Sequence, residues 1–468
     1  MNQKYKTLAK DTVIFSLGKF GSRLVLFFLV PLYTNFLSKA EYGTADLVFT
    51  VSQLLIALFS VVIFNSVTRY GLSRGIRRED VLFNAFVVLI GTAAITLLAT
   101  PLFSFYRGIS SWRWYLTGII ITAAVMDVEM NYLKVCGKNL TYSMISIIQA
   151  AVLAGCNILF LVVLSIGVRG YLLSTILSYI SSIVLAFVCG SMLRELRRGC
   201  FDRDLLRQML LYSAPLILNN ISWWIIQSSD KLMLEGMINS SALGLYSAAA
   251  KIPSLINVVV SIFHLSWGIS SIKEYESSNQ LDFYSNVFKV FSFCIFSCCI
   301  LLNAIVKPFM HFYVGADFRE AWHYTPILVA SAGFSALSIY FGTLYGALKK
   351  TKNNMITTLI GAIVNLIVNY ICILLVGIWG ALIGTLVSYL VVAGLRMVEI
   401  HRFIPFEIDF CRTIFNSILL ILHAVFVSFD FHIFPVSAIC IVLFAAVNKD
   451  VLCKTYVFAR ELIRRKRR

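Results

Sequence analysis

Two cations stand one helical turn apart inside an apolar run near the start of the chain. The run "SLGKFGSRLVLFFLVPLYTNFL" covers residues 16–37 and contains Lys19 and Arg23. Residues spaced i and i+4 share one face of a helix. A charge at mid-bilayer costs roughly 2.5 to 3.5 kcal/mol, so it needs a partner, a water-filled cavity or a route to the interface. Lys19 and Arg23 are therefore candidate anion-binding residues.

Acidic side chains inside other apolar runs are candidate partners for these cations. The rise of a helix places Lys19 about 10 Å and Arg23 about 16 Å from the cytoplasmic start of the run. Asp127, seven residues before Lys134 in a run of opposite direction, is expected at the depth of Lys19 and is its candidate counter-ion. Arg23 is then left without a counter-ion; alternatively, it forms a fixed ion pair with Asp127 or Glu129 that only holds the lobe together.

The corresponding run of the second half offers amides and indoles. The stretch "APLILNNISWWIIQSSDK" contains Asn219, Asn220, Trp223 and Trp224. Amides can pair with sugar hydroxyls, and an indole can stack on a pyranose ring. The alternative is that the asparagines bridge helices and a tryptophan faces lipid.

Three further charges are candidates for ion pairing, gating or coupling. Asp230 is expected about 9 Å from the outer end of its run and Lys251 about 12 Å into the next run, which suggests a pair. That pair is either a fixed salt bridge or a gate that parts when a cavity opens outward. Asp46, near the outer end of the second run, could join it or stay alone.

Motifs for enzyme chemistry are missing from the sequence. The six histidines have no metal-ligand spacing, and no GxSxG, P-loop or HExxH occurs. The eleven cysteines form no CxxC. We therefore predict neither metal nor cofactor, and no catalytic residue.

The elements that position these residues are predicted membrane helices. The chain is 59% hydrophobic and 13% charged, which is too little polar surface for a globular protein of 468 residues. Apolar windows of roughly 20 residues predict fourteen spans. They cover residues 12–37, 42–68, 80–105, 112–133, 140–165, 168–190, 209–235, 243–270, 285–306, 322–347, 354–376, 378–400, 411–429 and 431–450.

The distribution of positive charge predicts the orientation of these spans. We assign 30 of the 40 Lys and Arg residues to the N-terminus, the even-numbered loops and the C-terminus. This positive-inside pattern puts both termini in the cytoplasm. The tail "ELIRRKRR" is expected to bind anionic headgroups, and no nucleic acid partner is predicted.

An internal repeat divides the spans. The loop "FLSKAEYGTADLV" aligns with "MINSSALGLYSAA" at an offset of 201 residues, which matches Gly43 with Gly244. The stretch "GVRGYLLSTILSYI" matches "GIWGALIGTLVSYL" in two glycines, Thr, Ser and Tyr. We predict an all-α fold with a first lobe of six helices (1–200), a second (201–402) and a segment (403–468) holding spans 13 and 14 and the basic tail. The lobes form a parallel repeat about the membrane normal.

These features together resemble a known family. Fourteen spans, "FLSKAEYG" after the first span, "SSDKLML" closing the seventh and "ALGLYSAAAKIP" opening the eighth are similar to Wzx-like polysaccharide flippases. That family belongs to the superfamily of lipid II flippases and multidrug (MATE) antiporters. The resemblance implies a protein of the bacterial cytoplasmic membrane that moves undecaprenyl-pyrophosphate-linked oligosaccharide to the outer leaflet. Membrane lipids and polysaccharide polymerase or assembly proteins are the partners it implies.

The resemblance gives the candidate residues roles. Arg23, helped by Lys19, would hold the pyrophosphate, because a guanidinium fork matches phosphate oxygens. The amides and indoles of the seventh span would hold sugar while the lobes rock about a central cavity.

Two other functions stay open. One is a cation-coupled multidrug antiporter of the same superfamily, although a cavity for cationic drugs should expose carboxylates. The other is a membrane-embedded polysaccharide polymerase or ligase, which would need a larger outer loop than "KPFMHFYVGADFREA".

Overall fold

The computed structural model describes residues 25–73, 75–275 and 279–452. Across these ranges the regular structure is helical, without a strand. Helices satisfy their own backbone hydrogen bonds, which is the requirement for crossing lipid. Twelve helices of the described part are long and apolar enough to span a membrane, and two shorter apolar helices are Val25–Phe36 and Ile433–Val447. The count of fourteen spans stays a prediction, because much of the run 12–37 lies outside the described residues.

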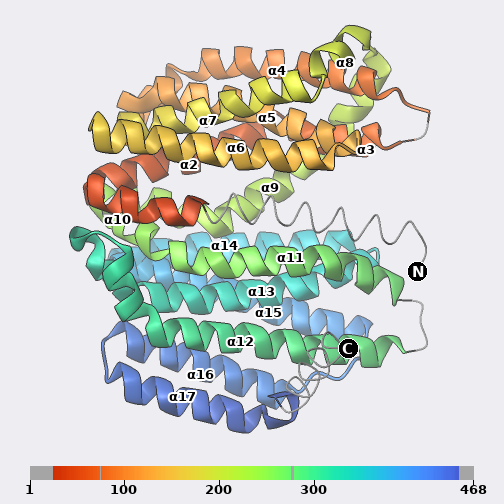
Figure 1. The fold of residues 1–468 in the computed structure, drawn as a ribbon. Helices are drawn as coiled ribbons and strands as arrows, with labels where there is room; N and C mark the ends of the chain where they lie inside the picture. Colours follow the sequence, from red (N-terminus) through yellow and green to blue (C-terminus); the bar gives the residue numbers. More distant parts are fainter. Residues whose placement is uncertain (1–24, 74, 276–278, 453–468) are drawn as a thin grey trace, which may run out of the picture. The chain divides into compact units, whose positions relative to one another are not determined.

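Packing divides the chain into two compact units, and the first comprises Met1–Ser247. Its long helices lie side by side (Figure 1). They are α2 (Lys39–Phe59), α3 (Ile63–Gly71), α4 (Arg78–Ala99), η1 (Leu102–Phe105), η2 (Ser110–Trp112), α5 (Arg113–Val135), α6 (Asn139–Asn157), the π-helical η3 (Ile158–Val163), α7 (Gly167–Cys189), α8 (Met192–Arg198), α9 (Arg203–Met237) and α10 (Ser240–Ala249), which reaches the boundary.

The second unit comprises Ala248–Arg468. Its helices are α11 (Lys251–Lys273), α12 (Gln280–Tyr313), η4 (Ala316–His323), α13 (Thr325–Ala347), α14 (Thr351–Val376), α15 (Ile378–Phe403), α16 (Phe410–Ser428) and α17 (Ile433–Val447). Helix α13 packs against α11, α12, α15 and α16. Since 83% of its most apolar window is buried, α13 is the central helix of this unit.

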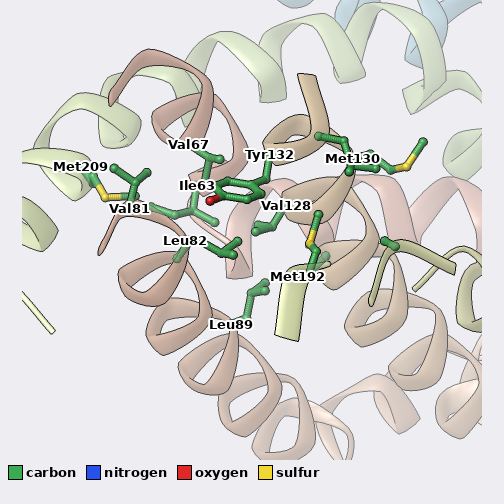
Figure 2. Close-up of a cluster of buried hydrophobic side chains, with 14 of the residues drawn as sticks. Ile63, Val67, Val81, Leu82, Leu89, Val128, Met130, Tyr132, Met192 and Met209 are labelled. Carbon is green, nitrogen blue, oxygen red and sulfur yellow. The ribbon is translucent and has the colours of Figure 1, made fainter. Parts of the chain in front are cut away.

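Tightly packed apolar side chains hold the first unit together at one end. Figure 2 shows this cluster, which joins α3, α4, α5, α8 and α9. Its labelled members are Ile63, Val67, Val81, Leu82, Leu89, Val128, Met130, Tyr132, Met192 and Met209. Lipid tails are as apolar as these side chains, so close dispersion contact, rather than escape from water, stabilises such packing in a membrane.

Predicted spans and observed helices agree well where the apolar pattern is uninterrupted. The predicted spans 354–376 and 378–400 correspond to α14 (Thr351–Val376) and α15 (Ile378–Phe403). Interruptions were not predicted. The second span divides into α2 and α3, and the eighth into α10 and α11. The two lobes 1–200 and 201–402 and the segment 403–468 stay a prediction. The two units defined by packing have a different boundary, after Ser247.

Candidate functional site

The cations Lys19 and Arg23, from which the sequence analysis starts, lie outside the described residues. The described candidates Asp46, Asn219, Asn220, Trp223, Trp224 and Asp230 all lie on α2 or α9, in the first unit. Lys251 begins α11 in the second unit. The site is therefore built from α2, α9 and α10.

Helices α2 and α10 begin with equivalent caps. At α2, the Ser38 side chain accepts a hydrogen bond from the Glu41 amide, and Glu41 accepts one from the Ser38 amide, which completes a capping box. At α10, the side chain of Asn239 accepts a bond from the Ala242 amide at 2.9 Å. Asn239 is the residue 201 positions after Ser38, so the sequence repeat extends to how each helix starts.

The two capped helices touch through their glycines. A Cβ atom placed on Gly43 would lie 2.0 Å from the carbonyl oxygen of Ser240, and one placed on Gly244 would lie 2.0 Å from that of Lys39. Only a residue without a side chain permits backbones to approach so closely. Lys39 and Ser240 are themselves 201 residues apart, so the contact is reciprocal: each repeat presents the same glycine to the same carbonyl of the other.

A buried ion pair joins three helices about one helical turn after the crossing glycines along α2 and α10. Lys231 Nζ on α9 lies 2.6 Å from Asp46 Oδ2 on α2, and the two side chains are 17% and 3% exposed. The same oxygen accepts a hydrogen bond from Ser247 Oγ on α10 at 2.8 Å. Desolvating two charges is costly unless each is fully paired, so removing either partner would leave an expensive buried charge. We call Asp46, Lys231 and Ser247 the buried triad.

Asp230 extends the site on α9. Its Oδ1 accepts a hydrogen bond from the Lys231 amide at 2.9 Å, and its Oδ2 accepts one from the hydroxyl of Tyr246 on α10. Asp46 and Asp230 therefore both bind α10. Because Lys251 belongs to the other unit, the Asp230–Lys251 pair stays a prediction.

Two of the four amide and indole candidates on α9 form hydrogen bonds to backbone carbonyl oxygens. Trp224 Nε1 donates to the Thr50 carbonyl oxygen on α2 at 3.0 Å, and Asn220 Nδ2 donates to the Leu216 carbonyl oxygen of its own helix at 2.8 Å. Asn219 and Trp223 are half-buried. The bond of Trp224 stabilises the α2–α9 contact, and a role of these residues in sugar binding stays a prediction.

The Glu235 carboxylate, at the C-terminal end of α9, contacts polar side chains from two other segments. Ser240 Oγ donates to Glu235 Oε1 at 2.9 Å, and Tyr106, between η1 and η2, lies beside the same carboxylate. Burial, and secondarily the charge of Glu235, raises the pKa of the Tyr106 phenol above its usual value. The phenol stays protonated, and it contacts the Leu232 carbonyl oxygen at 3.5 Å.

Asp127, the predicted counter-ion of Lys19, lies on α5 with Glu129 two residues further along the helix. Asp127 is half-buried and close to the charge of Lys134. Glu129 is fully buried, and neither of its carboxylate oxygens has a hydrogen-bond partner among the described residues. Any pairing of either acid with Lys19 or Arg23 lies outside the described residues.

Arg396 is a buried charge that the sequence analysis did not single out. It lies on α15 with 1% of its surface exposed. Its guanidinium donates to Thr357 Oγ1 (3.0 Å), Thr358 Oγ1 (2.8 Å), and the carbonyl and hydroxyl oxygens of Ser338 (2.9 and 3.1 Å). So complete a set of partners indicates a structural role, namely holding α13, α14 and α15 together.

The sequence does contain a signal for the buried triad. Asp46 and Ser247, which share a hydrogen bond, are separated by the repeat offset of 201 residues. Lys231 lies inside the seventh predicted span, 209–235, but the sequence analysis did not single it out. Its partner could not be chosen, because the repeat does not fix which face of α9 meets α2. Among the described residues, no cluster of three His, Cys, Asp or Glu could hold a metal ion.

Solved structures with the same arrangement of helices are membrane transporters. The lipid II flippase MurJ in an inward closed conformation has a TM-score of 0.69 at 16% identity, covering 96% of this chain and 100% of that one. An inward-facing multidrug resistance MATE transporter of the MOP superfamily has a TM-score of 0.66 at 13% identity, covering 81% and 98%. The Vibrio cholerae MATE transporter VcmN D35N mutant has a TM-score of 0.60 at 14% identity, covering 85% and 97%.

These likenesses define the class: an all-helical, multi-pass membrane protein with the MurJ/MATE fold. Residues 8–266 match the model of the polysaccharide biosynthesis protein family. This match covers more than half of the 468 residues, and the chain belongs to that family, as its resemblance to polysaccharide flippases implied. No curated protein sequence matches the chain.

Proposed function

We propose that this protein flips undecaprenyl-pyrophosphate-linked oligosaccharide repeat units from the cytoplasmic to the outer leaflet of the bacterial cytoplasmic membrane. Its membership of the polysaccharide biosynthesis family and its MurJ/MATE fold support a transporter of lipid-linked cargo. The product would feed capsule, O-antigen or exopolysaccharide synthesis, where a polymerase acts next. Arg23 and Lys19 bind the pyrophosphate in this proposal.

The observation that carries the mechanism is the buried triad beneath the glycine crossing. A transporter that alternates between two sides needs contacts that are strong when formed and few enough to break together. The Asp46–Lys231 pair, with Ser247 on the same oxygen, binds α2, α9 and α10 at one point. We propose that the triad holds the outer side of the cavity closed and separates when the cavity opens outward.

Mass spectrometry of undecaprenyl-linked lipids, in cells with and without the protein, tests the function. Accumulation of one complete lipid-linked oligosaccharide in depleted cells is the expected result, and it identifies the cargo. Expression of the wild-type chain should clear the accumulated lipid, and Asp46→Asn should clear it more slowly. An unchanged lipid pool would refute the flippase proposal.

A multidrug antiporter is the second candidate, because several structural neighbours are MATE transporters. The two functions predict different phenotypes for the same depleted cells. Sensitivity to cationic drugs together with an unchanged lipid pool would favour the antiporter. Normal drug sensitivity with accumulated lipid-linked oligosaccharide would favour the flippase.

A further inference from the structure

A pocket of about 600 Å³ opens in the second unit, apart from the candidate site. Its walls come from the end of α12, from η4 and from the turn between α16 and α17. The charge pattern assigns this end of the helices to the outer side of the membrane. The volume lies in the range of small-ligand sites.

Cationic and titratable groups dominate the polar lining of this outer pocket. Lys307, His311, Arg319 and His432 line it, with Asp430 as the one acid among its lining residues. Lys307 Nζ is 2.6 Å from Asp430 Oδ2, so these two charges largely cancel. Arg319 is exposed and has no ion-pair partner among the described residues. Its guanidinium fork is therefore available to an incoming anion.

The turn that supplies Asp430 and His432 has a demanding backbone. Asp430 has φ 59° and His432 has φ 39°, both in the left-handed region that residues other than glycine seldom adopt. Lys307 holds the turn at Asp430, and His323 Nδ1 lies 2.7 Å from the Ser428 carbonyl oxygen just before it. Such conformations persist only where surrounding contacts impose them, and they are common at ligand-binding positions.

Large apolar side chains adjoin the cations. Phe312 on α12 is 87% exposed and Phe434 on α17 is 73% exposed, and both line the pocket with Ile433. A free phosphate ion would gain nothing from these rings. A lipid would bring a phosphate to Arg319 in the connecting helix η4 and acyl chains to the phenylalanines, which lie at the ends of α12 and α17.

We propose that the outer pocket binds the phosphate group of an anionic membrane phospholipid, with Arg319 as the principal phosphate ligand and Phe312 and Phe434 against the acyl chains. Asp430 opposes binding through its charge and restrains Lys307. The exposed Lys307–Asp430 pair is weak enough to open when a phosphate competes for the lysine. None of its lining residues has a role in the transport proposed above.

Binding of a short-chain phosphatidylglycerol to the purified full chain in detergent tests the proposal, with short-chain phosphatidylcholine as the zwitterionic comparison. Arg319→Gln should weaken phosphatidylglycerol binding about fivefold, the effect of one cation near an anionic headgroup. Asp430→Asn should strengthen binding by a similar factor, and asparagine tolerates the left-handed backbone of that position. The matched control is Arg402→Gln, which removes an exposed arginine from the last turn of α15, outside the lining of the pocket.

The opposite signs expected for Arg319→Gln and Asp430→Asn separate a binding site from a folding defect, which would weaken binding in both. Equal losses in Arg319→Gln and Arg402→Gln would show general attraction to charge and overturn the proposal. Equal affinity for phosphatidylcholine would overturn it as well. Displacement of the lipid by millimolar inorganic phosphate would show that the pocket is a site for free phosphate, which would also overturn the proposal of a lipid ligand.

Discussion

At the scale of single residues, the structure distinguishes two kinds of intramembrane charge. Arg396 has hydrogen-bond partners on every side and belongs to the static framework of its unit. Asp46 and Lys231 pair with one another across two helices, and hydroxyl groups of Ser247 and Thr50 add one hydrogen bond to each, so a movement of one helix can break their contact. The two kinds of charge should respond differently to substitution.

The first prediction concerns the buried triad. Asp46→Asn and Lys231→Met should each lower the free energy of unfolding by about 3 kcal/mol, because each leaves the other charge buried without its partner. The double variant should lose clearly less than the sum of the two. Unfolding by SDS, followed by tryptophan fluorescence, measures all three variants. Additive losses would mean that the two side chains do not interact.

The second prediction concerns Arg396. Arg396→Lys keeps the charge but cannot reach the same four acceptor atoms, so the free energy of unfolding should fall by about 3 kcal/mol. Arg402→Lys, at the exposed end of the same helix, is the matched control and should leave stability unchanged. Similar thermal unfolding of the two variants would contradict the framework role of Arg396.

At the scale of elements, the glycine crossing sets how closely α2 and α10 approach. Gly43→Ala should lower the free energy of unfolding by about 1 to 3 kcal/mol, because its Cβ would overlap the Ser240 carbonyl oxygen. Gly91→Ala in α4 is the control, since no atom lies within 4 Å of the added methyl group. It should be neutral or slightly stabilising. Equal effects of the two substitutions would show that the crossing tolerates a side chain.

Helices and their order could be predicted from the sequence, because apolar length and charge bias act locally along the chain. The break between α10 and α11 and the π-helical turn after α6 could not, since they depend on what each helix packs against. The position of Asp46 near the outer end of its span was predicted. Its partner Lys231 was not, because two residues 185 apart meet only through tertiary packing.

At the scale of the whole molecule, the orientation predicted from charge can be tested with a native cysteine. Cys200, between α8 and α9, is exposed, and the positive-inside pattern puts it in the cytoplasm. A membrane-impermeant maleimide should label it in inside-out vesicles and not in intact cells, as read by peptide mass spectrometry. Arg107→Cys, in a predicted outer loop, should show the reverse. Labelling of Cys200 in intact cells would show that the orientation of the chain is opposite to the predicted one.

Transport itself tests the cations that lie outside the described residues. Arg23→Ala should strongly reduce clearance of the lipid-linked oligosaccharide in cells that depend on this protein, because the pyrophosphate loses its guanidinium partner. Arg23→Lys should retain part of the activity, since the charge remains but the fork is lost. Full clearance by Arg23→Ala would remove this residue from the proposed mechanism.

The glycine crossing also bears on how such a chain can evolve. Gly43 and Gly244 each receive the carbonyl of the other repeat. In an ancestor assembled from two identical half-length subunits, a single codon would specify both glycines, and one mutation would damage both contacts at once. Once the halves are fused, each glycine mutates separately. Selection must then preserve two codons to maintain one crossing, while residues away from it, such as the cations of the first half, are free to diverge.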